Sequence, residues 1–321
     1  MLRESNKLQI SPSLRMAMVA ALLCALLLPA SSLSASAQDK DKKPAPADRA
    51  RKDDGKVPSE KELEKEKKIQ EKARAAEARL SPVETIVELA IIAYGGRKQL
   101  ETVRAGIHEE GTIRLATDQG DLTGDFSLRS IRREKTWQDL LRVDLNLTPP
   151  GAEPRPGAGV KYTIAFNGAS VWSAQNNQYV NPRPEADASF RAQLTHEYMA
   201  LLRYKEDGSK LELVGPETVV GVDTNVIDLT NPNGEKTRFW ISTKTYRVLH
   251  LEYELKPAEA QTVTKYRISY YYSPIRVVQN TLVPVRRVMM QDGKFVQEIT
   301  LNNITYSAKL DPEIFQHLQE Q

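Results

Sequence analysis

The stretch Gly95-Gly96-Arg97-Lys98 has residue types that could hold a phosphate, because glycine backbone N–H groups and a lysine side chain both favour anions. A phosphate-binding loop, however, needs two glycines with four residues between them, then Lys and Ser or Thr, placed between a strand and a helix. Here the glycines are adjacent and follow an apolar run with helical spacing. They therefore predict the end of one helix, in the left-handed conformation open to glycine, and a short second helix over residues 97–103.

The four histidines, His108, His196, His250 and His317, do not form a metal-binding pattern. His196-Glu197 lacks the second histidine, one helical turn later, that a zinc site of this type needs. The sequence also contains no Gly-x-Ser-x-Gly nucleophile motif. We therefore expect no metal, no cofactor and no catalytic residue. A pair of carboxylates has no fixed spacing in sequence, so a hydrolase with such a site stays open as a third hypothesis.

The elements that would position any site are mostly strands, because apolar and polar residues alternate beyond residue 105. Strands are predicted over residues 107–115, 122–128, 141–147, 162–166, from 171, 219–222, 225–230, 236–242, 246–255, 263–272, 276–290 and 294–307. One amphipathic helix is expected at 185–204. Since strands and helices do not alternate, a nucleotide-binding parallel sheet is not expected. The pattern predicts a mainly β (α+β) protein with a large, twisted antiparallel sheet or a barrel.

Aromatic and aliphatic side chains gather on one face of several predicted strands, as in Tyr266, Ile268 and Tyr270. Two interpretations stay open: an ordinary core between sheet and helices, or a cavity for a hydrophobic ligand. A highly curved sheet with few helices would leave such a cavity, and binding pockets are mostly apolar. The residues predicted to line it are Phe126, Leu128, Leu141, Val143, Tyr162, Ile164, Phe166, Trp172, Trp240, Tyr253, Tyr266 and Tyr270.

The N-terminus has the features of an export signal. An apolar run over residues 16–30 is short for a membrane span, and Ala35-Ser-Ala37 supplies the small residues that signal peptidase needs. We expect a Sec-type signal peptide over residues 1–37, cleaved after Ala37, and a periplasmic protein. An uncleaved anchor is one alternative. A lipid-modified Cys24 is the other, which Leu23 disfavours because a small residue is needed there.

Cleavage would remove the only cysteine and leave a mature protein without one. That excludes disulfides, thiol nucleophiles and cysteine-ligated metals in the mature chain. The net charge of the whole chain is only +3, which gives no basic field to attract nucleic acid, so no nucleic-acid partner is expected.

A charged linker is predicted over residues 38–80. Its first part is rich in Pro, Ala and charged residues and is expected to be disordered, and from Ser59 it is expected to form a solvated helix. Whether it is a spacer or binds an anionic surface stays open. The folded domain is predicted over residues 81–321, and Ser81-Pro82-Val-Glu84 predicts the start of its first helix.

Several short motifs occur together in the chain. They are a helix that ends in Ala93-Tyr94-Gly95-Gly96, a Val-Gly-x-x-x-x-Val/Ile-x-Leu strand over residues 220–229, a Phe-Trp-Ile strand at 239–241, and Leu-Asp-Pro-x-x-Phe at 310–315. Together they resemble the LolA/LolB-like superfamily of bacterial outer-membrane lipoprotein-sorting proteins. The resemblance implies an open, strongly curved antiparallel half-barrel with helices over its concave side. In that family the space between sheet and helices holds acyl chains of lipoproteins or other hydrophobic ligands.

From these features we expect a periplasmic, non-catalytic binding or carrier protein for a lipid, a lipoprotein acyl chain or another hydrophobic ligand. The alternative is an envelope-stress sensor or protein-interaction module on the same half-barrel, with an envelope protein as its partner. We expect a monomer, and peripheral contact with the membrane stays open.

Overall fold

The computed structural model describes residues 80–150, 159–256 and 262–317. The predicted signal peptide, and the predicted linker as far as residue 79, lie outside the described residues. In the part that is described, none of the helices is both long and apolar enough to cross a membrane.

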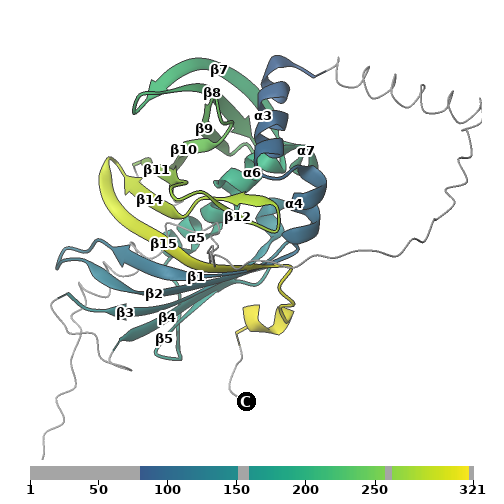
Figure 1. Cartoon of the computed structure of the whole chain (residues 1–321). Coiled ribbons are helices and arrows are strands. Elements are labelled where there is room, and N and C mark those ends of the chain that lie inside the picture. The colour runs from purple at the N-terminus through teal and green to yellow at the C-terminus, as the bar shows by residue number, and fades with distance from the viewer. Residues whose placement is uncertain (1–79, 151–158, 257–261, 318–321) are drawn as a thin grey trace, which may run out of the picture.

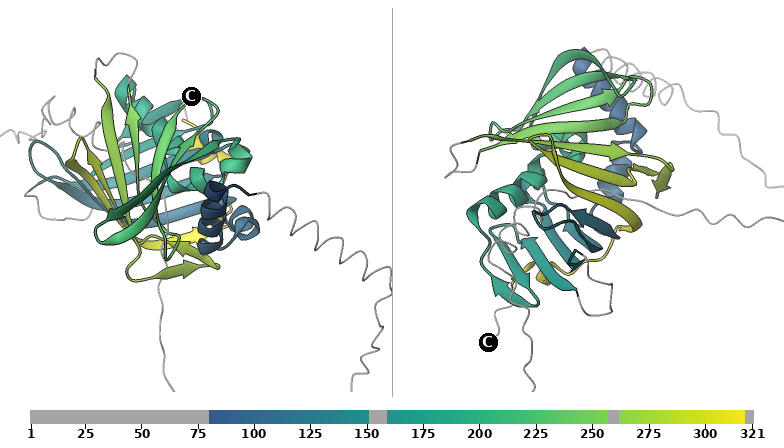
Figure 2. Two further views of the ribbon diagram at one scale, coloured as in Figure 1. Left: turned by 90° about the horizontal axis from the view of Figure 1, so that it is seen from above. Right: turned by 90° about the vertical axis from the view of Figure 1, so that its left-hand side faces the viewer.

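One curved sheet of 13 strands makes up most of the described structure (Figures 1 and 2). Its strand order is β6-β5-β4-β3-β2-β1-β15-β14-β11-β10-β9-β8-β7, and all neighbours pair antiparallel. The edge strands β6 (Gln178–Val180) and β7 (Lys210–Val219) lie at opposite ends of this order, so the sheet does not close. The prediction of a mainly β protein with an open antiparallel half-barrel is confirmed.

The two halves of the chain each supply one half of the sheet. The first half contributes β1 (Gly106–Leu115), β2 (Leu122–Ile131), β3 (Leu140–Thr148), β4 (Val160–Phe166) and β5 (Val171–Gln175). The second contributes β8 (Val222–Thr230), β9 (Lys236–Ser242), β10 (Val248–Leu255), β11 (Thr264–Tyr271), β14 (Arg286–Gln291) and β15 (Lys294–Tyr306). The halves join where β1 pairs with β15, for example Ile113 opposite Ile299, so residues far apart in sequence share one concave face.

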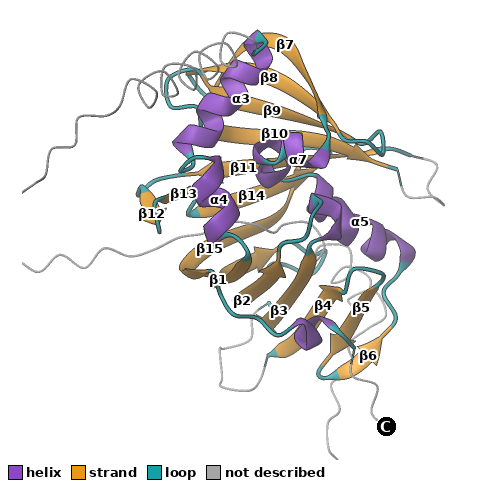
Figure 3. Ribbon diagram, turned by 90° about the vertical axis from the view of Figure 1, so that its right-hand side faces the viewer, coloured by secondary structure: helices purple, strands orange, loops and turns teal. Residues whose placement is uncertain are grey.

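The helices lie on the concave side of this sheet (Figures 1 and 3). They are α3 (Pro82–Ala93), α4 (Arg97–Val103), α5 (Pro184–Thr195), α6 (Tyr198–Leu202) and α7 (Tyr204–Asp207). Two short 3₁₀ turns are η1 (Thr136–Gln138) and η2 (Pro312–Phe315), and η2 lies against the convex face, where the Trp172 indole donates to Phe315 O. Val87, Ile91, Phe190 and Leu201 of these helices belong to one buried cluster with the inward side chains of the sheet. The helix layer therefore shares a single core with the concave face.

The double glycine ends α3, as the sequence predicted. Gly95 and Gly96 have φ of +120° and +86°, which few other residues adopt, and Gly96 N–H donates to Ile91 O at 2.9 Å. At the other end of α3, Ser81 and Glu84 form the expected capping box. Arg97 pairs with Glu88 at 2.9 Å rather than binding an anion.

The structure differs from the predicted elements at several places. Residues 219–222, predicted as one strand, contain the turn Val220-Gly221 between β7 and β8. The single helix at 185–204 is broken into α5, α6 and α7. The extended backbone at Glu197 (φ −135°, ψ 168°) separates α5 from α6, and Arg203 (φ −104°, ψ 10°) separates α6 from α7. The strand at 276–290 is divided into a separate hairpin, β12 (Arg276–Val278) with β13 (Thr281–Val283), and then β14. Pro284 lies at this division, since proline has no N–H for a sheet ladder. The long edge strand β7 was not predicted, because most of its residues are exposed and its apolar alternation is weak.

Candidate functional site

Ten of the twelve residues predicted to line a cavity form one apolar surface, here called the concave wall. They are Phe126, Leu128, Leu141, Val143, Tyr162, Ile164, Phe166, Tyr253, Tyr266 and Tyr270, and all belong to the buried core cluster. The strand register explains why they meet: Leu128, Val143 and Ile164 stand side by side on β2, β3 and β4, and Tyr253 is opposite Tyr266. The two tyrosine rings are stacked with centroids 5.1 Å apart.

The expectation that Trp172 and Trp240 join this wall is wrong, because both lie on the opposite, convex face. Successive strand residues point to opposite faces, so a residue between two inward neighbours points outward. Trp172 stands opposite Ala165, and its indole N–H donates to Phe315 O at 2.7 Å. Trp240 lies against His250 and donates to a carboxylate oxygen of Glu217 at 2.7 Å. Each indole thus makes a hydrogen bond on the convex side, to η2 in one case and to β7 in the other.

The concave wall is covered in this structure. Each of its ten side chains is at most 6% exposed. Phe190 and Leu194 of α5 and Leu201 of α6 are buried in the same cluster. Side chains of the helix layer therefore occupy the space in which a ligand was expected.

A cluster of charged side chains lies inside this apolar core, and we call it the buried charged cluster. Its buried members are Arg104, Glu109, Glu197, Arg203 and Arg287, and Asp139, 14% exposed, lies at its edge. Arg287 on β14 donates from Nη2 to Oε2 of Glu109 on β1 at 3.1 Å, and both side chains are at most 1% exposed. An ion pair so deep in a protein rarely serves stability alone, because moving the two charges out of water costs on the order of several kcal/mol per ion.

Arg104 follows α4 and enters the core just before β1. Its Nη2 donates to the Tyr198 hydroxyl at 3.1 Å, and its Nη1 faces the sulfur of Met199 at 2.6 Å. The guanidinium also lies over the rings of Tyr198 and Tyr306, at 5.6 and 5.2 Å from their centroids. Arg104 is thus held by aromatic rings and a thioether.

Arg203 and Asp139 form the second ion pair of the cluster. Arg203 Nη1 lies 2.6 Å from Asp139 Oδ2, and its Nη2 donates to Arg133 O at 2.7 Å. Burial raises the pKa of Asp139 to about 6, although the positive charge of Arg203 opposes the shift. This pair fastens the end of α6 to the segment between β2 and β3.

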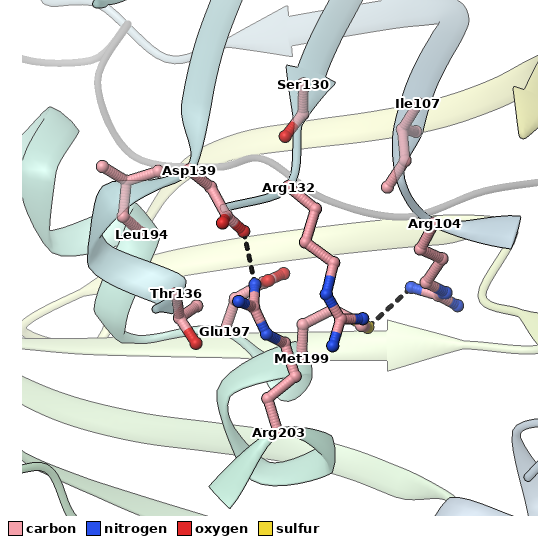
Figure 4. Close-up of a pocket in the computed structure, with 10 residues that line it drawn as sticks. All are labelled: Arg104, Ile107, Ser130, Arg132, Thr136, Asp139, Leu194, Glu197, Met199 and Arg203. Carbon is pink, nitrogen blue, oxygen red and sulfur yellow. Dashed lines mark hydrogen bonds and ion pairs between the residues drawn. The ribbon is translucent and has the colours of Figure 1, made fainter. Parts of the chain in front are cut away.

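Glu197 lies between the two ion pairs. Its side chain is buried and its Oε2 has no hydrogen-bond donor among the described residues. Burial raises the pKa of Glu197 well above its ordinary value, and the nearby Arg104 and Arg203 offset this only in part. Beside it is a small cavity of about 20 Å³, lined also by Arg104, Asp139 and Arg203 (Figure 4). That volume holds roughly one water molecule or one ligand oxygen.

A larger cleft of about 520 Å³ lies at the rim of the second half-sheet, where His196 and Tyr253 meet charged residues. Two of its four carboxylates, Asp228 and Glu252, each pair with two cations. Burial raises the pKa of each, but the hydrogen-bonded cations outweigh burial and lower it. Carboxyls held as anions do not provide the proton donor that a glycosidase pair needs. Within the described ranges, no group of three His, Cys, Asp or Glu residues could hold a metal ion.

The buried charged cluster was missed in the sequence, although a signal for it is present. In β1, Glu109 occupies the same alternation phase as the inward Ile107 and Ile113, and in β14 Arg287 shares the phase of the inward Met289. A charge in the apolar phase of a strand marks a buried polar group that needs a partner. Reading the phase of each charged residue would have found this pair.

No protein-family model and no curated protein matches the chain. Among solved structures, a putative outer membrane lipoprotein-sorting protein domain from Vibrio parahaemolyticus is 14% identical with a TM-score of 0.47, over 71% of this chain and 95% of that one. A LolA superfamily protein from Nitrosomonas europaea is 15% identical with a TM-score of 0.46, over 74% and 99%. A DUF1329 family protein from Desulfovibrio piger is 15% identical with a TM-score of 0.43, over 74% and 98%.

Two of these structures bear the family description that the sequence motifs suggested.

Proposed function

We propose that this protein binds a hydrophobic ligand, such as a lipid or a lipoprotein acyl chain, between the concave wall and helices α5 and α6, and that it does so in the periplasm without chemical change to the ligand. The observation that carries the proposal is the concave wall itself. Ten apolar and aromatic side chains from both halves of the sheet form one surface that a thin helix layer covers.

The helix layer is suited to separate from the wall. Helix α6 has only five residues and no side-chain cap at its N-terminus, and it is disconnected from α5 by the extended Glu197. Helices this short have little stability of their own, so α6 depends on its contacts with the wall. An acyl chain offers the wall the same kind of apolar contact, and exchange of one for the other leaves little net change in buried apolar area.

The buried charged cluster does not favour the hydrolase hypothesis. Asp139 and Glu197 line the same cavity, but its volume of about 20 Å³ is far below the pocket size that encloses a small substrate. Two carboxylates of the rim cleft, Asp228 and Glu252, are paired with lysines and arginines. Its other two, Glu235 and Glu254, are exposed side chains.

The test is to purify the mature protein from its native host and release any bound molecule under denaturing conditions for mass spectrometry. Uptake of a fluorescent acyl probe by the delipidated protein is the second readout. We expect a co-purifying lipid or saturable uptake with one site. A protein without lipid that also fails to take up the probe contradicts the proposal. A single protein partner, captured equally with and without lipid, would favour the sensor or interaction alternative instead.

A further inference from the structure

Arg287 holds more hydrogen-bond donors than the described residues satisfy. Only its Nη2 has an acceptor, Glu109 Oε2, whereas Nε and Nη1 have none. The side chain is 1% exposed, so bulk water does not reach these groups. A buried donor without an acceptor is destabilising, and arginine cannot avoid this by losing its proton.

Arg104, another member of the buried charged cluster, also has donors without a good acceptor. Its Nε has no acceptor among the described residues, and its Nη1 faces only the thioether of Met199, a weak acceptor. It forms no ion pair with a carboxylate of the described chain, and its one oxygen partner is the Tyr198 hydroxyl. Arg203 differs in degree: its Nε also lacks a hydrogen-bond acceptor, but its Nη1 bonds the Asp139 carboxylate and its Nη2 the backbone carbonyl of Arg133.

Both arginines adjoin the concave wall. Arg287 stands directly opposite Tyr270 in the pairing of β11 with β14. Tyr198, which binds Arg104, has its ring 5.5 Å from that of Tyr270. A chain lying on the wall would thus bring one of its ends to the guanidinium groups. The cavity beside Arg104 already has room for about one oxygen atom.

We propose that Arg104 and Arg287 bind the anionic head, a carboxylate or a phosphate, of the hydrophobic ligand. A guanidinium offers a planar fork of donors that matches two oxygens of either group, and such charge-assisted bonds are the strong ones. The ligand's oxygens would accept from the donors that the chain leaves unsatisfied. This assignment rests on the proposed function, because it places the head at the end of a tail held by the concave wall.

The test compares ligands that share one tail. A 16-carbon fatty acid, the corresponding alkyl phosphate and the corresponding alcohol compete for wild-type protein loaded with a fluorescent acyl probe. We expect the acid and the phosphate to compete about tenfold better than the alcohol, since only they form charge-assisted bonds. In the Arg104→Gln and Arg287→Gln variants, the affinity for the fatty acid should fall about tenfold, to that for the alcohol. The affinity for the alcohol should stay unchanged.

Arg129→Gln is the matched control, because Arg129 lies on the convex face and pairs with Asp144 at 2.7 Å. This variant should keep the wild-type preference for the acid and the phosphate over the alcohol. If a glutamine variant does not fold, judged by circular dichroism, Arg104→Lys and Arg287→Lys retain the charge without the fork, and we expect a partial loss of the preference.

Three results separate the possibilities. Equal competition by acid, phosphate and alcohol in the wild type overturns the head-group assignment and leaves the proposed function standing. Displacement of the fatty acid by inorganic phosphate alone, at concentrations near those of the alkyl phosphate, overturns it in favour of a site for a free anion. Failure of the wild-type protein to take up the acyl probe at all means that the proposed function itself has failed.

Discussion

Glu197 is the residue whose ionisation the fold changes most clearly. Its carboxyl is enclosed between two ion pairs of the buried charged cluster, and burial holds its pKa well above the ordinary 4.5. A raised carboxyl pKa means that the folded protein keeps a proton that the unfolded chain has already released. The contribution of this group to stability is therefore greatest below pH 4.5 and declines as the pH rises toward the folded pKa.

Replacement Glu197→Gln should remove that pH-dependent loss, because an amide of the same shape cannot ionise. We expect the free energy of unfolding at pH 7 to rise by about 1 kcal/mol. Urea unfolding measured between pH 4 and 8 checks this. Glu101→Gln on the surface of α4 is the control and should leave the curve as it is. A destabilised Glu197→Gln protein at pH 7 would show that the ionised carboxylate supports the fold.

His196 has the opposite effect on the pH profile. Burial lowers its pKa to about 3, from 6.5 in the unfolded chain, while its Nδ1 lies 2.7 Å from the hydroxyl of Thr237. The unfolded chain therefore binds a proton first, and stability falls as the pH drops below 6.5, by about 1.4 kcal/mol per pH unit.

His196→Asn should flatten this fall, since asparagine does not titrate and can keep a hydrogen bond to Thr237. The measurement is the slope of unfolding free energy between pH 6.5 and 4, with His108→Asn, whose imidazole is only half-buried, as the control. An unchanged slope in His196→Asn would mean that His196 is protonated in the folded state.

At the scale of elements, the α3–α4 turn depends on two glycines in different surroundings. A Cβ at Gly95 would lie 2.4 Å from the carbonyl oxygen of Asn280, whereas one at Gly96 would meet no atom within 4 Å. Both have positive φ, but only Gly95 is also closely packed.

Gly95→Ala should therefore destabilise the protein by about 3 kcal/mol, through steric overlap with the β12–β13 hairpin as well as backbone strain. Gly96→Ala carries the backbone strain alone and should cost about 1 kcal/mol. Thermal unfolding of the two variants checks the difference. Equal losses would mean that the hairpin yields readily to the added methyl group.

The two faces of the sheet offer a matched pair of valines. Val143 belongs to the concave wall and Val226 is buried on the convex face, outside the core cluster. Val143→Ala and Val226→Ala should each lower stability by about 1–3 kcal/mol, because each removes two buried methyl groups.

Only Val143→Ala should change ligand binding. The space it opens lies where an acyl chain would pack, and a flexible chain can fill a dry apolar cavity that the closed protein leaves empty. We expect tighter binding of the acyl probe and a larger ligand-induced rise in Tm than for Val226→Ala. Identical rises for the two variants would place the ligand elsewhere.

The sequence predicts most of the strands, the helix end at Gly95-Gly96 and ten residues of the concave wall, because alternation and glycine conformation are local properties. Trp172 and Trp240 lie on the face opposite to the predicted one, because the phase of a residue in its strand, and not its aromatic character, sets the direction of its side chain. Glu109 and Arg287 show what the sequence does not predict. Each is a single charged residue in the apolar phase of its strand, and only the pairing of β1 with β15, and of β15 with β14, brings the two side chains together.

At the scale of the whole molecule, the folded domain has its own core, and residues 38–58 precede its first helix by more than twenty residues. Deletion of these residues should leave both the Tm and acyl-probe uptake unchanged, because the charged segment lacks the apolar side chains that a core requires. Circular dichroism and probe titration check this. A lower Tm after deletion would mean that the segment packs on the domain.

The most direct test of the account uses a fatty acid with a photoreactive group in its tail. After irradiation of the wild-type protein, mass spectrometry locates the labelled residues. The account predicts labels on the concave wall, such as Val143, Tyr162 and Tyr253, and on α5 and α6. Labels confined to the convex face around Trp172 and Trp240, or no saturable labelling at all, would contradict it.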